Sequence, residues 1–366
     1  MSWLEESAWQ SLGGSFSTES IAIPSSLIAQ KRVLITGAGG SIGSALAHAV
    51  AAHNPEQILL LEASEQALYQ IDRKLTTSHT PILASVGDPT ALQDTFENHR
   101  PHIVFHAAAF KHVPLMELHP FAALENNAVA TFALTQTAVR YRAEQVVLVS
   151  TDKAVDPASM MGASKRIAEL TALALQSPAT KIKAVRLGNV WASQGSVVPL
   201  FQEQIARRQP VTVTHPDATR YFITIGQAAA LLLFALSNEF PGAILVPELA
   251  RPIRVEEIAR IFIQRSGSES QIVYTGLRPG EKLHEQLLSP GEAFLAEAVA
   301  PLRAIHSATI SAAQAREAVE ELQYAIQRRN LSRLLRTVVR LIPTYEPSET
   351  LLAEQAAEPL MEGRNA

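Results

Sequence analysis

The sequence has 366 residues, and 31 Lys and Arg against 35 Asp and Glu give it a formal net charge of −4. Apolar residues make up 47% of the chain and charged residues 18%, which excludes a disordered protein and argues against nucleic-acid binding through bulk positive charge. The absence of Cys excludes disulfide bonds, thiolate catalysis and Cys-ligated metals.

The N-terminal residues 1–30 are rich in Ser and weakly patterned, and we expect them to form an arm with room for one short helix. They show no basic stretch followed by an apolar one, so no signal peptide is expected. The longest apolar run of the chain, residues 228–236, is about half the length that a membrane-spanning helix needs. We therefore expect a soluble, cytoplasmic chain without a membrane segment.

From Arg32 onward, short apolar strands alternate with helical runs. Strands are expected at 33–35, 58–61, 82–86, 103–106, 146–149 and 183–187, and helices from Ser41 and over 64–75, 120–142 and 162–175. Continuous apolar strands between helices are typical of a parallel sheet covered on both faces, and right-handed crossovers make such a sheet doubly wound. The pattern predicts an α/β fold with a Rossmann-type doubly wound parallel sheet over residues 31–190.

The alternation ends after about Asn189, where prolines begin to separate shorter elements. Residues 191–345 are expected to form a smaller C-terminal substrate-binding α/β domain with C-terminal helices, and its strands could cross over into the first sheet. The helical pattern of residues 305–342 fits either a hairpin packed on its own domain or an oligomer interface. The last residues, 346–366, are rich in Glu and Ala and are expected to be a flexible tail.

A glycine-rich segment joins the first strand to the first helix. Glycines at this place permit a tight turn and let the backbone approach a pyrophosphate, while the helix N-terminus offers free N–H groups. The segment predicts dinucleotide binding rather than an ordinary strand-to-helix turn. Its expected binding residues are Thr36, Gly37, Gly40, Ser41, Ile42 and Gly43.

An acidic residue, Glu62, ends the second strand. A carboxylate at this point can accept hydrogen bonds from both hydroxyls of an adenosine ribose and would repel a 2′-phosphate. Glu62 therefore favours NAD over NADP as the cofactor, with a solvated strand-end carboxylate as the alternative interpretation.

The fifth strand ends in Ser150-Thr151-Asp152-Lys153, and Met161-Gly162-Ala163-Ser164-Lys165 begins eight residues beyond Lys153. A carboxylic acid and an amine at the carboxyl edge of a parallel sheet can serve as a general acid/base pair. The alternative interpretation is that Asp152 caps the following helix and that Lys153 is a surface ion-pair partner.

These motifs resemble the extended short-chain dehydrogenase/reductase family, in which the later segment normally reads Tyr-x-x-x-Lys. Met161 occupies the tyrosine position, and Met cannot act as a base. Residues 150–155 and 160–166 are similar to the nucleoside-diphosphate-sugar 4,6-dehydratases of polysaccharide biosynthesis, the CapD-like proteins, in the branch with Met in place of Tyr. The resemblance includes 109–117, 195–201, 219–222 and 278–282 and extends from about Arg32 to Pro343.

The resemblance implies a UDP-N-acetylglucosamine 4,6-dehydratase with bound NAD, acting as a homo-oligomer. In this activity C4 of the sugar is oxidised, C5 is deprotonated, water leaves from C6 and hydride returns to C6. The product is a UDP-4-keto-6-deoxy sugar for glycan synthesis. Many relatives with this Met carry an N-terminal membrane domain; with a 30-residue arm in that place, membrane attachment is not expected here.

The resemblance also implies chemical roles. Asp152 is expected to be the general acid for water elimination, and Lys153 the C5 base, which requires a depressed pKa. Thr151 is expected to hydrogen-bond the C4 oxygen. Lys165 is expected to bind the nicotinamide ribose and to help relay the C4 proton, which Met161 cannot accept.

Further contacts follow from the same resemblance. Cofactor contacts are implied for Ser64, Val86, Asp88, Ala107, Ala108, Ala109 and Asn127, although Asp88 would also suit a helix N-cap. Substrate contacts are implied for Lys111 and His112 at the sugar, Asn189, Arg220 and Arg278 at the diphosphate, Glu281 at the uridine ribose, and Val197, Pro199 and Thr212 at the uracil. Arginine suits a diphosphate because its planar fork pairs two oxygens, but each could also be an ordinary surface residue.

Two other functions stay open. An NDP-sugar 4-epimerase shares the fold, the cofactor and the C4 oxidation, but it normally keeps the tyrosine and needs no Asp-Lys pair. A catalytically silent NAD-binding protein is favoured by Met161 and disfavoured by the presence of Asp152, Lys153 and Lys165 together. The histidines show no metal-ligand spacing, so no metal is predicted.

Overall fold

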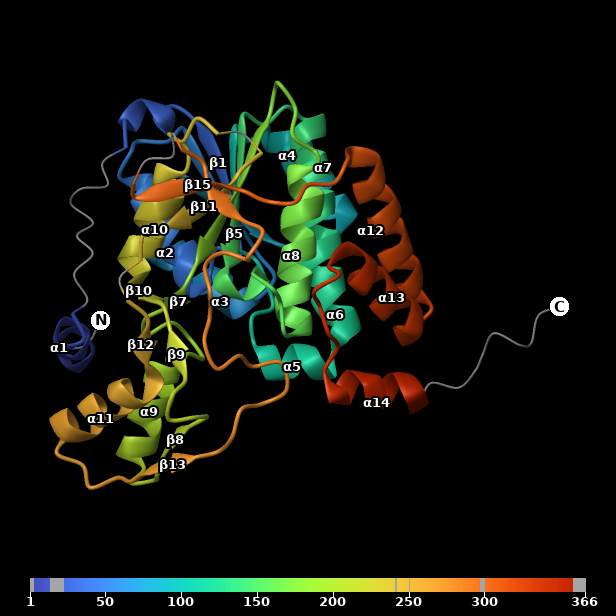
Figure 1. The fold of residues 1–366 in the computed structure, drawn as a ribbon. Coiled ribbons are helices and arrows are strands. Elements are labelled where there is room, and N and C mark those ends of the chain that lie inside the picture. The colour runs from blue at the N-terminus through green and yellow to red at the C-terminus, as the bar shows by residue number, and fades with distance from the viewer. Residues whose placement is uncertain (1–2, 14–22, 241, 250, 297–299, 358–366) are drawn as a thin grey trace.

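The computed structural model describes residues 3–13, 23–240, 242–249, 251–296 and 300–357. Its main strands are β1 Arg32–Thr36, β2 Gln57–Glu62, β3 His79–Leu83, β4 Ile103–His106, β5 Gln145–Thr151, β6 Lys181–Leu187, β11 Ile244–Pro247, β14 Ala293–Phe294 and β15 Leu302–His306. They form one nine-stranded sheet in the order β14-β15-β11-β6-β5-β4-β1-β2-β3 (Figure 1). The strands from β3 to β11 pair in parallel, and β15 and β14 join antiparallel.

The predicted doubly wound parallel sheet is confirmed. Strands β1 and β4 are neighbours although β2 and β3 lie between them in sequence, so the winding reverses at β1. Every residue of β4 is buried, as expected for a strand covered on both faces. The reversal leaves a crevice at the carboxyl ends of β1 and β4, where sheets of this kind bind their ligands.

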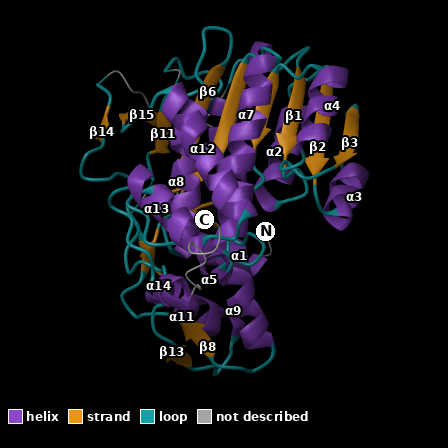
Figure 2. Ribbon diagram, turned by 90° about the vertical axis from the view of Figure 1, so that its right-hand side faces the viewer, coloured by secondary structure: helices purple, strands orange, loops and turns teal. Residues whose placement is uncertain are grey.

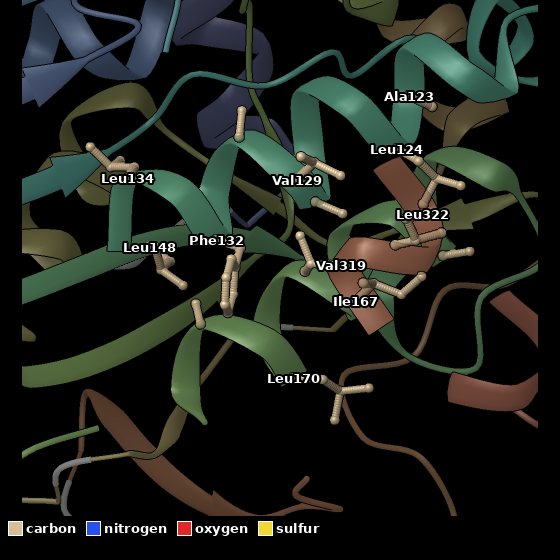
Figure 3. Packing of buried hydrophobic residues seen from close by; sticks show 14 of the residues in the cluster. Ala123, Leu124, Val129, Phe132, Leu134, Leu148, Ile167, Leu170, Val319 and Leu322 are labelled. Carbon is tan, nitrogen blue, oxygen red and sulfur yellow. The ribbon is translucent and has the colours of Figure 1, made fainter. Parts of the chain in front are cut away.

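Helices cover both faces of the sheet (Figure 2). One face carries α2 (Ser41–Ala51), α3 (Glu65–Lys74) and α10 (Ile225–Phe234), whose apolar side chains form one buried cluster with the strands. The opposite face carries α4 (Pro89–His99), α7 (Ala130–Arg140), α8 (Met160–Leu173), α12 (Ala312–Gln327) and α13 (Leu331–Leu341). Figure 3 shows side chains of α7, α8 and α12, among them Phe132, Ile167 and Val319, converging in this second cluster. The α12–α13 hairpin therefore packs on its own chain.

The predicted helical run over 120–142 is helical without a break from Pro120 to Arg140, but it changes helix type on the way. After α5 (Val113–Leu118) and α6 (Pro120–Leu124), a π-helical turn over Glu125–Val129 precedes α7. The turn brings the buried side chain of Asn127 against the loop after β4, where it bonds the backbone of Phe110. A π-helical turn of this kind is frequent at functional sites.

A smaller lobe lies below the main sheet in Figure 1. Its elements are α9 Val197–Ala206, β8 Val211–Val213, β9 Thr219–Arg220, β12 Ile253–Arg254, α11 Val255–Ser266 and β13 Ile272–Tyr274, joined to the sheet by β7 Asn189–Val190 and β10 Phe222–Ile223. Helix α1 (Trp3–Ser11) packs on this lobe, with the rings of Trp9 and Trp191 5.3 Å apart. Strands β11, β14 and β15 belong to the main sheet rather than to the lobe, so residues 191–345 are divided between the two.

Two predicted boundaries are wrong. The third strand is β3, His79–Leu83, rather than 82–86, because the partner strand β2 ends at Glu62, opposite Leu83. The expected flexible tail contains a helix, α14 (Glu349–Ala357). This helix is held in place because Leu351 is fully buried in the apolar cluster that also contains α7, α8, α12 and α13. Residues 14–22 of the arm and 358–366 of the tail lie outside the described residues.

Candidate functional site

A cavity of about 480 Å³ opens at the carboxyl edge of the main sheet, where the glycine segment and the loops after β4 and β7 also line it. The predicted site residues that line it are Gly37, Gly40, Ser41, Ile42, Gly43, Ala107, Ala109, Lys111, His112, Thr151, Lys153, Met161, Lys165 and Asn189. Those outside its lining are Thr36, Glu62, Ser64, Val86, Asp88, Ala108, Asn127, Asp152, Val197, Pro199, Thr212, Arg220, Arg278 and Glu281. The structure therefore brings the glycine segment, the pair Lys111 and His112, and residues of the segments 151–153 and 161–165 to one place.

The glycine segment is packed too tightly for side chains. Gly37 has a φ of +64°, and a Cβ atom on Gly43 would lie 2.1 Å from the carbonyl oxygen of Gly37. Gly40 is the N-cap of α2 and gives that helix no side-chain cap. A helix N-terminus left in this state is suited to bind an anion.

Glu62 is tied to the glycine segment rather than simply solvated. Its carboxylate accepts hydrogen bonds from the backbone N–H of Gly39 and of Ser64, each at 3.0 Å. Asp88 caps α4 by accepting from the N–H groups of Thr90 and Ala91, which confirms the N-cap interpretation. The contacts of Glu62 with a ribose and of Asp88 with an adenine stay predictions.

Buried polar groups lie behind the residues that line the cavity and bond to one another. His106 lies between the hydroxyls of Thr36 and Thr131, at 2.7 and 2.8 Å. Burial lowers the pKa of His106 to about 3, so the ring is neutral near pH 7. Asn127 donates to the Ser164 hydroxyl at 3.0 Å and so connects the loop after β4 to helix α8.

Thr151, Asp152 and Lys153 form a hydrogen-bonded group where β5 ends. The Asp152 Oδ1 atom accepts from the Thr151 hydroxyl at 2.9 Å and from Lys153 Nζ at 3.0 Å. Asp152 is fully buried, and its Oδ2 atom has no hydrogen-bond partner among the described residues. Asp152–Ala154 form a short 3₁₀-helical turn, and its N-cap is Thr151, whose side chain accepts from the Lys153 N–H. The interpretation of Asp152 as a helix cap is therefore wrong.

The amine of Lys153 is surrounded by acceptors. Its Nζ atom donates to Asn189 Oδ1 at 2.9 Å and lies 3.4 Å from Glu285 Oε1. Burial disfavours the charged amine, but the carboxylates of Asp152 and Glu285 more than offset it and raise the pKa of Lys153 above its ordinary value. The expected depressed pKa is therefore wrong for this structure.

Helix α8 presents Met161 and Lys165 to the same cavity. They are four residues apart, hence on one face of the helix, and the Ser159 side chain caps the helix by accepting from the Gly162 N–H. Lys165 Nζ donates to the Val149 carbonyl at 2.7 Å. Burial lowers the pKa of Lys165 to about 8.

A loop after β7 lines the cavity beside the predicted sugar-binding pair Lys111 and His112. Lys111 Nζ donates to the Gln194 carbonyl at 2.6 Å, and the Gln194 N–H donates to the Ser41 hydroxyl at 3.2 Å. Burial lowers the pKa of Lys111 and, together with the charge of Lys111, that of His112. Gln194 was not predicted, since a glutamine between small residues in a loop carries no sequence signal.

The predicted uridine and diphosphate residues of the smaller lobe have protein partners. The Arg220 guanidinium donates to the carbonyls of Lys282 and Leu283 at 2.8 and 3.1 Å. The Arg278 Nε atom donates to Glu281 Oε1 at 3.0 Å. Thr212 accepts from the Gln204 side chain at 2.8 Å, and Val197 and Pro199 lie in the first turn of α9. Arg220 is buried, so a surface role is wrong for it.

Residues 33–306 match the model of the family described as polysaccharide biosynthesis protein. The chain belongs to this family. The chain is 40% identical over 283 residues to the capsular polysaccharide biosynthesis protein CapD of Staphylococcus aureus, an alignment that covers 74% of this chain and 47% of CapD. It is 42% identical over 279 residues to the probable polysaccharide biosynthesis protein EpsC of Bacillus subtilis, covering 73% of this chain and 46% of EpsC. The chain thus spans about half the length of these two relatives.

The chain is also similar to a curated UDP-glucose 4-epimerase, and it shares its fold with further solved structures. The UDP-glucose 4-epimerase of Rickettsia typhi is 33% identical over 272 residues, covering 72% of this chain and 79% of the epimerase. The structure of Pen from Bacillus thuringiensis has a TM-score of 0.69 at 26% identity, over 80% of this chain and 99% of Pen. A dTDP-glucose 4,6-dehydratase double mutant, DesIV of Streptomyces venezuelae, shares the fold at a TM-score of 0.62 and 20% identity, over 70% of this chain and 89% of DesIV. In the part of this chain that the structure describes, no helix is long and apolar enough to span a membrane.

Proposed function

We propose that this protein is an NAD-dependent UDP-N-acetylglucosamine 4,6-dehydratase. The observation that carries the proposal is the group of Thr151, Asp152 and Lys153 beside the cavity, in which one carboxylate oxygen accepts from both a hydroxyl and an amine. These three groups supply an acceptor, an acid and a base, so Met161 is needed for none of these roles. Membership of the polysaccharide biosynthesis family supports this activity class.

The residues present fit a bound dinucleotide. The closely packed glycines and the uncapped start of α2 suit a pyrophosphate, while Glu62 and Lys165 would hold the adenosine and nicotinamide riboses. When bound, the nicotinamide would accept hydride from C4 of the sugar and return it to C6. Among the relatives, a Thermus thermophilus UDP-glucose 4-epimerase structure is described as a complex with NAD.

The tightest glycine gives a test of this cofactor site. Replacing Gly43 by Ala should weaken NAD binding by about 10- to 100-fold, because the added methyl group would collide with the Gly37 carbonyl and distort the phosphate-binding turn. Isothermal titration with NAD measures the effect. The control is Gly226→Ala, whose Cβ would have one neighbour, the Thr224 hydroxyl, at 4.0 Å. Unchanged NAD affinity in folded Gly43→Ala protein would contradict the assignment.

Oxidation at C4 releases the hydroxyl proton of the sugar, and Thr151 and Asp152 provide a route for it. If the C4 hydroxyl lies against Thr151, the threonine oxygen accepts its proton while passing its own to Asp152 Oδ1, 2.9 Å away. Asp152 is then a neutral acid in a buried place, ready to protonate the departing C6 hydroxyl as water. The route assigns to Thr151 the proton transfer for which the usual tyrosine is missing.

In this proposal Lys153 is the base that removes the C5 proton. Uptake of a proton by Asp152 removes one of the two negative charges that hold the Lys153 ammonium. The 21% exposed side chain can then release a proton to water, and the neutral amine takes the C5 proton and later returns it to C5. A proton taken up again from water restores the Lys153 ammonium. The net change is loss of one water, and both side chains end as they began.

The proton route predicts a contrast between two substitutions of one residue. Thr151→Val should lower the rate of dehydration by about 100-fold, while Thr151→Ser, which keeps the hydroxyl, should stay within about threefold of wild type. The measurement is steady-state formation of the dehydrated UDP-sugar. Thr135→Val is the control, because Thr135 is a threonine outside the cavity lining whose hydroxyl bonds the Thr131 carbonyl within α7. Equal rates for the Val and Ser variants would rule the route out.

A 4-epimerase is the second candidate, favoured by the 33% identity to the Rickettsia typhi UDP-glucose 4-epimerase. Epimerisation needs C4 oxidation and reduction but no acid at C6 and no base at C5. The buried Asp152 beside the Lys153 amine favours the dehydratase over this candidate. Incubation with UDP-N-acetylglucosamine separates them, since an epimerase changes the sugar without changing its mass.

A further inference from the structure

A carboxylate outside the predicted site, that of Glu285, lies against Lys153. The Glu285 Oε1 atom is 3.4 Å from Lys153 Nζ and 3.8 Å from Arg220 Nε, and the side chain is 3% exposed. Its Oε2 atom is buried without a hydrogen-bond partner in the described part of the chain, with Lys282 Nζ 4.0 Å away. A buried carboxylate with an unpaired oxygen is costly, so its place beside the reacting amine calls for a physical reason.

Glu285 connects two parts of the site that are distant in sequence. Asp152 and Asn189, the other acceptors of the Lys153 amine, belong to the main-sheet side of the cavity. Glu285 follows the segment of Arg278 and Glu281 in sequence. The Arg220 guanidinium donates to a backbone carbonyl of that segment and so holds it in place. The amine is therefore held between the sheet edge and the segment proposed to bind the uridine diphosphate.

We propose that Glu285 is a positioning residue that fixes the Lys153 amine in the cavity and holds it as an ammonium group. This inference rests on the proposed function in one respect, the role of Lys153 as the C5 base. Asp152 loses its charge when it takes up the C4 proton, whereas Glu285, which lies beside Arg220 and Lys282, takes no part in that proton transfer. Glu285 is then the remaining anion that sets how readily Lys153 gives up its proton.

The groups around the Lys153 amine have opposite effects on its protonation. Asp152 and Glu285 stabilise the ammonium form, while burial and the positive charge of Arg220 oppose it. Removing the Glu285 charge therefore leaves the neutral amine easier to form and less firmly placed. Easier formation of the neutral amine shifts the pH profile of Lys153 reactivity. A purely structural role of Glu285 would leave that profile unchanged.

The test measures the protonation of the Lys153 amine directly and does not depend on enzymatic activity. Wild-type protein and the variants Glu285→Gln and Glu285→Asp are treated with acetic anhydride over a pH series, and acetylation of Lys153 is quantified by peptide mass spectrometry. Only the neutral amine reacts, so Glu285→Gln should shift the Lys153 curve to lower pH and Glu285→Asp should shift it less. The control is Glu292→Gln, which removes another buried carboxylate, one that binds Arg186 at 2.6 Å, and should leave the Lys153 curve in place.

An unmoved Lys153 curve in folded Glu285→Gln protein overturns the inference. If that variant does not fold, Glu285→Asp decides, and its unchanged curve likewise overturns it. The kcat profile for dehydration adds a second readout: its acid limb should move to lower pH, and its plateau should fall about 10- to 100-fold as the amine loses its position. A shifted labelling curve in a protein that releases no dehydrated sugar would reject the proposed function and leave the Glu285–Lys153 coupling standing.

Discussion

Replacing Asp152 by Asn is expected to lower the rate of UDP-N-acetylglucosamine dehydration by about 100- to 10,000-fold, the range for loss of a general acid. The amide is nearly the same size and can still accept a hydrogen bond from Lys153 or Thr151. It cannot take up the C4 proton or deliver one to the C6 hydroxyl. The substitution thus removes the proton transfer with little change to the buried packing around a fully buried side chain.

The matched control for this substitution is Asp72→Asn. Asp72 pairs with His79 at 3.1 Å, outside the cavity lining, so the rate should stay within about twofold of wild type. Both variants are compared by steady-state product formation at equal concentrations of folded, NAD-bound protein. Near wild-type turnover by Asp152→Asn would show that Asp152 is not the acid.

Replacing Arg186 by Met is expected to lower the free energy of unfolding by about 3–5 kcal/mol, the cost of breaking a buried ion pair by removing one partner. The Arg186 side chain is fully buried between Glu169 and Glu292, with nitrogen–oxygen distances of 2.9 and 2.6 Å. Methionine fills a similar volume but leaves two carboxylates without their main cation. Chemical denaturation measures the loss, with Arg207→Met as control, because the Arg207–Glu203 pair is exposed and worth about 0–1 kcal/mol.

The same ion pair predicts how acid unfolds the protein. Burial alone would raise the pKa of the Glu169 carboxyl, but Arg186 and Arg166 outweigh it and lower that pKa to about 2. A carboxyl whose pKa is lower in the folded than in the unfolded protein stabilises the fold at pH values above its unfolded-state pKa. This contribution is lost as the pH falls toward the folded-state pKa. Wild-type stability should therefore drop between about pH 4.5 and pH 2, and Arg186→Met should show a smaller drop across that window. An equal drop in both proteins would contradict the ion pair's role.

Local sequence patterns predicted most of the main sheet, because its strands are continuous apolar runs between helices. The glycine segment and the Asp152–Lys153 pair were also visible, since their positions at strand ends follow from the strands themselves. The third strand was misplaced because its limits depend on the partner strand β2, which ends at Glu62. The helix α14 was missed because Leu351 is stabilised by distant parts of the chain, which no local pattern reports.

The electrostatics of the site could not be read from neighbouring residues alone. Glu285 is 132 positions from Lys153 in the numbering, yet its Oε1 atom is 3.4 Å from the amine. The expected depressed pKa of Lys153 failed for this reason, because the second carboxylate was not foreseen. The bonds from the Arg220 guanidinium to backbone carbonyls of the segment that carries Glu285 were likewise not foreseen. The contact of Arg220 with a diphosphate stays a prediction.

The most direct test of the central claim is incubation of the NAD-bound protein with UDP-N-acetylglucosamine, followed by mass spectrometry of the nucleotide sugar. A 4,6-dehydratase predicts a product lighter than the substrate by the mass of one water, with no net consumption of NAD. A product of unchanged mass but altered C4 configuration would instead show an epimerase. Absence of any reaction on this or other UDP-sugars would contradict the account and favour a silent NAD-binding protein.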